Sequence, residues 1–219
     1  MLERHILSTR IERPDPSEEA AGARARLAGK FPRNSLRRMT HLGLLTGAAL
    51  DGVAVDAEDA VVYATTYAET RALEDFLASF PAASPLLFQS SIHPSAVQQV
   101  LIGRQQPIRR FWPVTGRRRL VESALLAALM EPAPRVVFTG GEERGGWLLK
   151  REMAADLTFA FGIVLTTGPD GAVGSIRFQP GGTGPDGPCP TLLAFAEAVS
   201  GRTPLRWRGA GGEWSVAWR

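Results

Sequence analysis

Cysteine is almost absent from this sequence: Cys189 is the only one among 219 residues. A single cysteine cannot form a disulfide within the chain or supply a zinc site built on several thiolates. The three histidines, His5, His41 and His93, lie far apart and lack the spacing of a metal-binding motif. The sequence therefore predicts no metal, no cofactor and a reducing compartment, for which the cytoplasm is the default expectation.

Long apolar runs are also missing. No stretch approaches the roughly 20 apolar residues that a membrane-spanning helix requires, and the first residues, MLERHILSTRIERPDPSEE, carry charges where a signal peptide has an apolar segment. The net charge is only +3, and the arginines are scattered apart from short runs such as 109–110 and 117–119. Nucleic-acid binders concentrate basic residues on one face. We therefore expect no membrane span and no nucleic acid, and an acidic protein partner fits the charge at least as well.

Strand-like and helix-like segments alternate along the chain. Apolar periodicity and Pro or Gly boundaries predict helices over 17–30, with Ser17 as the N-cap, and over 35–53, 70–80, 94–103, 117–129, 147–154 and 191–201. They predict strands over 59–66, 107–115 and 133–141, hairpins over 156–180 and 204–219, and a loop over 181–190. This order predicts an α/β fold with a mixed β-sheet packed with helices and closing β-hairpins. Residues 1–36 are expected to be a variable N-terminal arm, followed by one domain over 37–219.

The stretch PVTGRRRLVESALLAAL predicts a strand, a sharp turn at Gly116 and a helix. A helix N-terminus offers free N–H groups and a partial positive charge, which favour a nucleophile or an anion there. The turn has no strong nucleophile, and the first helical turn is expected to carry Arg117, Arg118 and Arg119. Either these cations form a solvated helix start, or they form an electropositive patch for the carboxylates or phosphates of a partner, which the planar guanidinium binds bidentately.

Several segments together carry a resemblance to a known family. They are VVYATTYAET, LLFQSSIHPSAVQQVLIG, FWPVTGRRRLVESALLAAL, VVFTGGEE, AFGIVLTT and WSVAWR. In order and spacing they resemble the N-terminal half of the β-ketoacyl synthases, which have the thiolase-like fold, and are most similar to the small branch called chain length factors. The resemblance covers roughly residues 36–219 and implies a thiolase-like half-fold.

The resemblance also implies which catalytic groups are missing. In this family the strand–turn–helix junction presents the condensing cysteine, whose thiolate accepts the acyl chain. Here the alignment places Gly116, or its neighbour Thr115, at that position. Cys189 is not expected to substitute, because it lies in a Gly- and Pro-rich loop far along the chain. The family's two catalytic histidines belong to the C-terminal half of the full-length fold, which the resemblance does not reach.

We therefore expect a non-catalytic, chain-length-factor-like subunit. The resemblance implies that it acts with a catalytic ketoacyl synthase, an acyl carrier protein or both, in type II fatty-acid, aryl-polyene or polyketide-like biosynthesis, as a homodimer or heterodimer. In this family the phrase matching SSIHPSAVQQ opens a helix near the dimer interface and the acyl channel. Ser91, His93 and Gln98 are therefore candidates for a channel or an interface.

An alternative is a small acyl-thioester hydrolase or acyltransferase that uses His93 with Ser90, Ser91 or Ser95. Catalysis of this kind requires a nucleophile within hydrogen-bond reach of the histidine; otherwise His93 only bonds to neighbouring backbone. A third hypothesis, nucleic-acid binding through the arginine run 117–119, has less support. Glu142 and Glu143 follow a predicted strand, where sites are common in α/β folds, although acids in a solvated loop would look the same.

Overall fold

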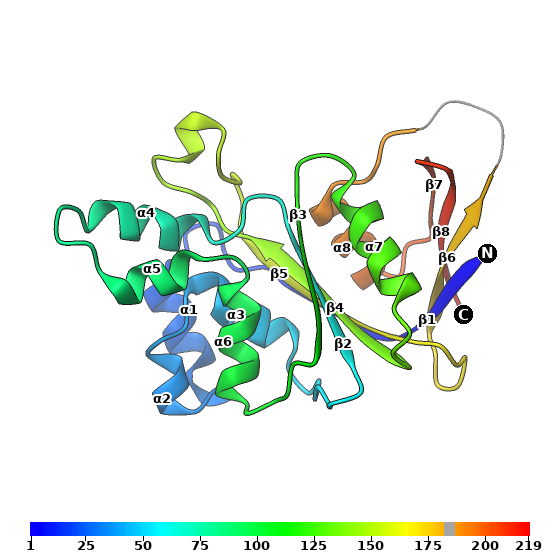
Figure 1. Cartoon of the computed structure of the whole chain (residues 1–219), viewed down its shortest axis with the longest axis horizontal. Helices are drawn as coiled ribbons and strands as arrows, with labels where there is room; N and C mark the ends of the chain where they lie inside the picture. The colour runs from blue at the N-terminus through cyan, green and yellow to red at the C-terminus, as the bar shows by residue number, and fades with distance from the viewer. Residues whose placement is uncertain (182–186) are drawn as a thin grey trace.

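Eight strands form one mixed sheet in this computed structural model, which describes residues 1–181 and 187–219 (Figure 1). The strand order is β3-β2-β4-β5-β1-β6-β8-β7. The strands are β1 (Leu2–Glu12), β2 (Ala60–Thr65), β3 (Arg110–Thr115), β4 (Arg135–Glu142), β5 (Phe159–Thr166), β6 (Gly174–Pro180), β7 (Leu205–Gly209) and β8 (Gly212–Trp218). The predicted α/β class with a mixed sheet is confirmed.

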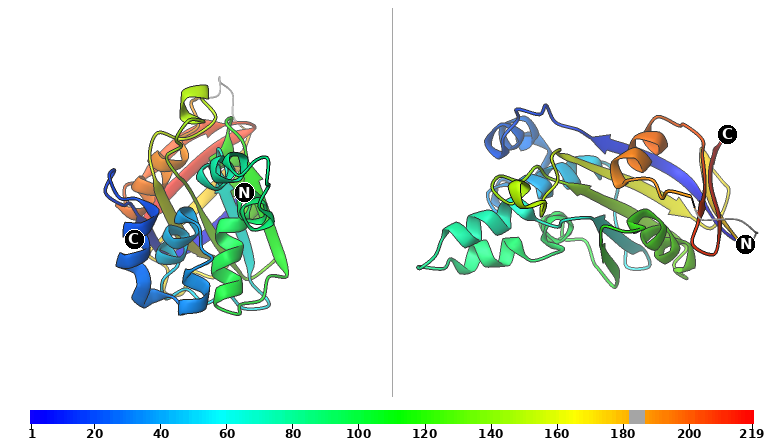
Figure 2. Two further views of the ribbon diagram at one scale, coloured as in Figure 1. Left: turned by 90° about the vertical axis from the view of Figure 1, so that its left-hand side faces the viewer. Right: turned by 90° about the horizontal axis from the view of Figure 1, so that it is seen from above.

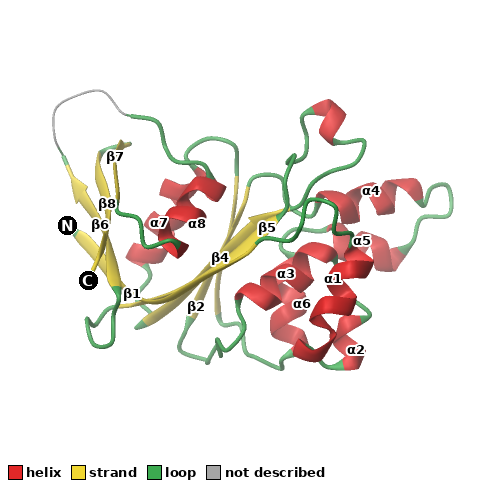
Figure 3. Ribbon diagram, turned by 180° about the vertical axis from the view of Figure 1, so that it is seen from behind, coloured by secondary structure: helices red, strands yellow, loops and turns green. Residues whose placement is uncertain are grey.

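Helices cover both faces of this sheet. They are α1 (Ala20–Leu27), α2 (Arg33–Leu36), α3 (His41–Ala49), α4 (Thr70–Ala78), α5 (Pro85–Ser91), α6 (Ser95–Gly103), α7 (Leu120–Met130) and α8 (Leu192–Ser200), with short 3-10 helices η1 (Ala28–Lys30) and η2 (Leu149–Arg151). The first six gather at one end of the molecule, whereas α7 and α8 lie along the sheet (Figures 2 and 3).

The strand β2 shows why the sheet is buried on both faces. Its residues AVVYAT are all buried, and successive side chains of a strand point to opposite faces. Ala60, Val62 and Ala64 enter the core beneath α7 and α8, whereas Val61 and Tyr63 pack with residues of α3 and α6. A continuous apolar run is typical of a strand covered on both faces.

The register of β2, β3 and β4 brings three strand ends together. β2 is parallel to both neighbours and pairs Thr65 with Thr115 and Ala64 with Gly140. The carboxyl ends of the three strands therefore meet at one edge of the sheet, which is the usual place for a site in an α/β fold.

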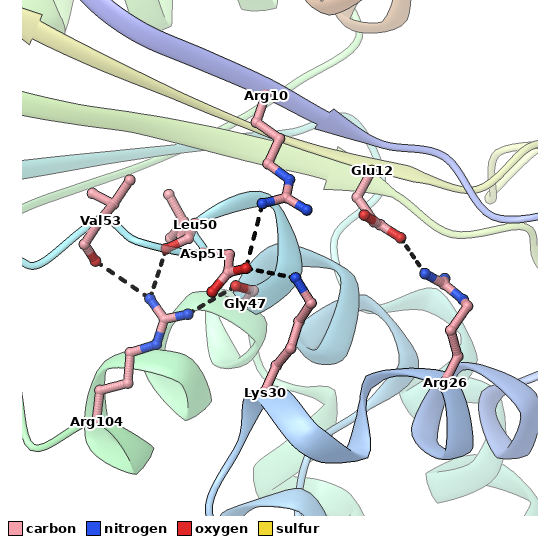
Figure 4. Close-up of polar contacts among 9 residues, drawn as sticks. All are labelled: Arg10, Glu12, Arg26, Lys30, Gly47, Leu50, Asp51, Val53 and Arg104. Atoms are coloured by element: carbon pink, nitrogen blue, oxygen red, sulfur yellow. Dashed lines mark hydrogen bonds and ion pairs between the residues drawn. The ribbon is translucent and has the colours of Figure 1, made fainter.

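The first residues are not a separate arm, as the sequence analysis expected for 1–36. β1 lies inside the sheet, antiparallel to β5 on one side and to β6 on the other. Ion pairs tie the segment around it to the helices: Arg10 and Lys30 contact Asp51 at 3.4 and 2.5 Å, and Glu12 contacts Arg26 at 2.5 Å (Figure 4). The strand was missed because LERHILSTRIE carries four charged residues and lacks the apolar run of a central strand.

The position of β1 also corrects the hairpin predicted over 156–180. Both of its strands form, as β5 and β6, but β1 lies between them, so they do not pair with each other. The terminal hairpin is confirmed as β7 and β8, which pair antiparallel. Part of the predicted loop 181–190 lies outside the described residues.

Helix boundaries differ from the sequence prediction in several places; for example, the helix predicted over 147–154 is only the short 3-10 helix η2. The predicted helix over 17–30 begins only at Ala20, and Ser17 bonds to Asp15 instead of capping it. The helix predicted over 35–53 is divided, because Thr40 caps a new helix by accepting the N–H of Gly43 at 3.1 Å. The sequence analysis predicted no helix between 80 and 94, but α5 starts there at Pro85, behind the N-cap Ser84.

Candidate functional site

The strand–turn–helix junction at Gly116 lies on an open cleft of about 640 Å³ at the carboxyl ends of β2, β3 and β4. Gly116 has a φ of +150° and no atom within 4 Å of where a Cβ would lie. Space for a side chain therefore exists, but the backbone conformation is one that residues other than glycine rarely adopt. Gly116 and the three arginines that follow it are the residues that the sequence analysis named as candidates at this junction.

The three arginines do not occupy the first turn of α7, as the sequence analysis predicted. The helix begins at Leu120, and Arg119 is its N-cap with a left-handed φ of +51°. Arg117 and Arg118 precede the helix, so their charges are not part of its N-terminal turn. The first turn instead carries Glu122, whose negative charge suits the positive end of the helix dipole.

Contacts orient two of these arginines. Arg119 forms an ion pair with Glu122 at 3.0 Å, and the guanidinium of Arg117 lies 5.1 Å from the ring centre of Tyr67, a cation–π contact. Residues 1–181 and 187–219 supply no such contact to Arg118, which is exposed. The cleft therefore has a cationic rim whose members are held in different ways.

Glu122 connects the junction to the closing hairpin. Its buried carboxylate accepts hydrogen bonds from the indole N–H of Trp207 at 3.3 Å and from the backbone N–H of Ala210 at 3.1 Å. A buried carboxylate is tolerated when charged and polar donors surround it. The sequence analysis did not single out Glu122, because a lone acid early in a helix has many ordinary explanations.

Cys189 lies at the same cleft, which corrects the expectation that its distance in sequence removes it from the junction. It lines the cleft with Gly116 and Leu120. Burial raises the pKa of its thiol, and the Glu122 carboxylate adds to the rise, while the backbone N–H groups of Glu122 and Val121 oppose it. The thiolate is the nucleophilic form of cysteine, so this environment keeps Cys189 in its less reactive form.

Glu142 closes the cleft beside β2. Its carboxylate accepts hydrogen bonds from the hydroxyl of Thr65 at 3.1 Å and from the backbone N–H groups of Thr66 and Tyr67. Burial raises its pKa, and these hydrogen bonds act against the rise. Glu142 therefore shapes the turn after β2, and the interpretation as an acid in a solvated loop is wrong.

Ser91, His93 and Gln98 do not line this cleft. His93 stacks on the ring of Tyr63, with 5.3 Å between ring centres, and its Nδ1 lies 3.6 Å from a carboxylate oxygen of Glu69. Gln98 lines a different cleft, of about 660 Å³, between α2, α5 and α6. The structure does not bring the three residues together with the junction.

No serine near His93 is arranged as its nucleophile. The hydroxyls of Ser90, Ser91 and Ser95 each donate to a backbone carbonyl, of Leu86, Phe88 and Ser90 respectively. Neither ring nitrogen of His93 has a hydrogen-bond partner in the described chain. This geometry gives no support to the hydrolase or acyltransferase alternative.

The described residues contain neither a metal-binding cluster nor a helix able to span a membrane. No group of three or more His, Cys, Asp and Glu side chains is arranged to hold a metal ion. None of the described helices combines the length and apolar character needed to cross a membrane.

The architecture defines the class: the chain has the thiolase-like α/β fold of the ketosynthases. It is similar to a chain of the complex between the ketosynthase ApeO and its chain length factor ApeC from Xenorhabdus doucetiae, with a TM-score of 0.65 and 18% identity over 99% of this chain and 100% of that one. It is also similar to a chain of the ishigamide ketosynthase/chain length factor, with a TM-score of 0.58 and 14% identity over 82% and 68% of the two chains. No protein-family profile and no curated protein matches the sequence.

Proposed function

We propose that this protein is a non-catalytic, chain-length-factor-like subunit that assembles with a catalytic ketosynthase. The observation that carries the proposal is the junction at Gly116: a ketosynthase-like fold retains the strand, the turn and the helix, but the turn holds no thiol. Condensation needs a sulfur nucleophile that accepts the acyl chain from a thioester. A chain without it contributes to assembly, to binding or to the length of the product rather than to bond formation.

Cys189 does not restore the missing chemistry. Although it lies on the same cleft, its burial and the neighbouring Glu122 carboxylate favour the protonated thiol. A condensing enzyme needs the opposite environment, in which the helix N-terminus and nearby cations stabilise a thiolate. We expect the isolated protein to form no acyl-enzyme on this cysteine.

The partner surface in this proposal is the edge of the sheet formed by β3 together with α7. β3 pairs only with β2 among the described strands, so its outer edge presents free backbone groups to another chain. Exposed apolar side chains lie on it and on α7: Trp112 is 50% exposed and Met130 65%. The similarity to proteins of ketosynthase–chain length factor pairs makes a ketosynthase the proposed partner, in a heterodimer.

The arginines beside the cleft suit a second, acidic partner. Arg117 lines the open cleft, and Arg118 follows it as an exposed residue before α7; their guanidinium groups can bind carboxylate or phosphate bidentately. We propose an acyl carrier protein as this partner, in fatty-acid, aryl-polyene or polyketide-like biosynthesis in the cytoplasm. The interaction would be weakened by salt, because it depends on exposed charges.

Co-expression with a ketosynthase encoded beside this gene tests the proposal. We expect the two chains to elute as one complex in size-exclusion chromatography with light scattering. Trp112→Glu together with Met130→Glu should abolish the complex, because two charges would be buried without partners. Trp147→Glu is the matched control, since Trp147 is 49% exposed elsewhere on the surface. A protein that stays monomeric beside every neighbouring synthase, or a complex unaffected by the double substitution, would contradict the proposal.

A further inference from the structure

A third cleft, of about 530 Å³, lies among α1, α3, α4 and α5 and shares no residue with the cleft at Gly116. Five arginines line it: Arg24, Arg37, Arg38, Arg71 and Arg144. Arg24 is held in place by donating to the backbone carbonyls of Leu36 and Met39. Arg37, Arg38 and Arg144 make no ion pair within residues 1–181 and 187–219. Three guanidinium groups are therefore available to a ligand.

Three helices begin at this cleft. Its lining includes Ala20 at the start of α1, His41 at the start of α3, and Arg71 in the first turn of α4. Each of these helices has eight or more residues, so each contributes a partial positive charge at its N-terminus. Burial lowers the pKa of His41, and despite the opposing charge of Glu18 the guanidinium groups around it lower the pKa further. The cleft therefore combines a cluster of full cationic charges with several helix N-termini.

Four carboxylates also line the cleft. Two of them, Glu18 and Glu143, do not neutralise the positive charge of its arginines. Glu18 is bound by Arg26, with one oxygen 2.8 Å from Nε. Glu143 is fully enclosed, and burial raises its pKa to about 7, so it is partly neutral at physiological pH. Glu19 and Asp75 stay at the lining as free acids. Arg71 is paired with Glu74, 3.9 Å away, and the other four guanidinium groups exceed the negative charge of Glu19 and Asp75.

Two buried polar atoms in this wall lack a partner. Glu143 is 1% exposed, and its Oε1 accepts the backbone N–H of Arg71 at 2.8 Å, but its Oε2 has no hydrogen-bond partner among the described residues. The Nε2 atom of His41 is likewise buried and unpartnered there. Buried polar atoms are normally satisfied, and a carboxylate oxygen without a partner needs a donor. A hydroxyl group of a ligand would supply one.

We propose that this cleft binds a phosphate monoester whose organic part carries hydroxyl groups. Arg37, Arg38 and Arg144 hold the phosphate, because the guanidinium fork matches its oxygens. The hydroxyl groups face Glu143 and His41, and the carbon skeleton lies against Leu86 and Leu87, which also line the cleft. The volume of the cleft is larger than inorganic phosphate alone requires and suits a small organic phosphate.

Isothermal titration calorimetry with the full chain tests this site, using glycerol 3-phosphate, inorganic phosphate and glycerol as probes. We expect glycerol 3-phosphate to bind, inorganic phosphate to bind more weakly and glycerol not to bind. Arg37→Ala with Arg38→Ala should weaken binding of glycerol 3-phosphate about a hundredfold or more, because two charge-assisted hydrogen bonds to the phosphate are lost. Arg151→Ala, an exposed arginine outside the cleft, is the matched control and should leave binding unchanged.

Other outcomes would test the phosphate contacts and the hydroxyl contacts separately. Equal binding of inorganic phosphate and glycerol 3-phosphate would support the anion site with free phosphate as its ligand and would overturn the hydroxyl contacts. No binding of either phosphate at millimolar concentration, or equal weakening by Arg151→Ala, would overturn the site. Assembly with a ketosynthase does not enter this experiment, so its result is independent of the proposed function.

Discussion

Strands β1 and β3 occupy positions in the sheet opposite to those that their sequences predict. β1 carries charges along much of its length and lies in the middle of the sheet, whereas β3, with the apolar residues FWPV, forms an edge. In β1, Ile6 is fully buried, while the charged residues at its far end reach Asp51 and Arg26 (Figure 4). In β3, Trp112 is half exposed. Burial therefore follows the position of a strand in the sheet more than its own hydrophobicity.

This difference separates two roles. An interior strand is paired on both sides, so its backbone is satisfied and its substitutions affect stability. An edge strand leaves one row of backbone groups unpaired and is available to another chain. The apolar side chains on β3 are therefore better explained by a partner than by the core of this chain.

The largest expected effect is on the free energy of unfolding, and it compares a buried residue of β1 with a partly buried residue of β3. Ile6→Ala should lower the free energy of unfolding by ~2–5 kcal/mol, because it leaves a cavity in a site that is fully enclosed. Val114→Ala in β3 is the matched control and should cost less, since Val114 is only partly buried. Urea unfolding measures both. Equal losses would mean that the edge strand is as much part of the core as β1.

A second prediction extends the comparison to buried and exposed carboxylates. Burial raises the pKa of Glu143 to about 7; the folded state therefore binds a proton that the unfolded state releases near 4.5. The contribution of Glu143 to the free energy of unfolding is fully present below pH 4.5. It is lost as the pH rises to 7 and is absent above that pH. Glu143→Gln, which cannot ionise, should therefore gain stability relative to the wild type over this range, by about 3 kcal/mol at most.

The measurement is the difference in unfolding free energy between Glu143→Gln and the wild type at several pH values. Asp51 provides the contrast: the hydrogen bond from Lys30 lowers its pKa, so Asp51→Asn should change the profile only as the pH falls into the acid range. A flat difference between pH 4.5 and 7 for Glu143→Gln would show that its carboxyl group is not desolvated as the structure indicates.

A smaller effect is expected at the end of β3. Gly116→Ala should cost about 1–2 kcal/mol, because the φ of +150° strains a residue with a side chain although space for a Cβ exists. Gly168→Ala is the matched control, since its added Cβ also meets nothing within 4 Å and its φ is ordinary. Thermal unfolding compares the two. If both substitutions had the same effect, the turn would not require glycine at 116.

The smallest expected effect lies on the surface beside β1. Asp51→Asn removes the contacts with Arg10 and Lys30 (Figure 4), but all three side chains are substantially exposed. Ion pairs of this kind contribute roughly 0.2–1 kcal/mol and are screened by salt. The loss should be measurable in urea unfolding at low ionic strength and should vanish near 1 M salt. A loss that persists in salt would indicate a structural role for Asp51 beyond charge.

The local segments were largely predictable. The strand VVYAT and the helix beginning at Ser95 follow from β-branched residues and from apolar spacing, both of which act within a few residues. Boundaries failed where a side chain competed with the periodic pattern: Thr40 caps α3 within a stretch predicted as one helix. Pro85 marked the start of α5, but that helix has few residues and none of them is buried, so its pattern is weak.

The site was only partly predictable for a related reason. The turn at Gly116 and the arginines are contiguous in the sequence, and the missing nucleophile follows from reading them. The position of Cys189 at the same cleft, and the bonds from Trp207 and Ala210 to Glu122, join residues more than 60 positions apart. The buried environment of Glu143 likewise forms only where α3 and α4 pack near the end of β4.

By itself the sequence determined that this is an α/β protein with a helix after each of several strands and no nucleophile at the junction where its resemblance expects one. These properties depend on residue type and short-range spacing. Only the tertiary structure decided that β1 divides β5 from β6, that β3 is left at the edge, and that the arginines lie before α7. Strand order and burial depend on contacts between distant segments, which compete for the same interior space and leave no local pattern in the chain.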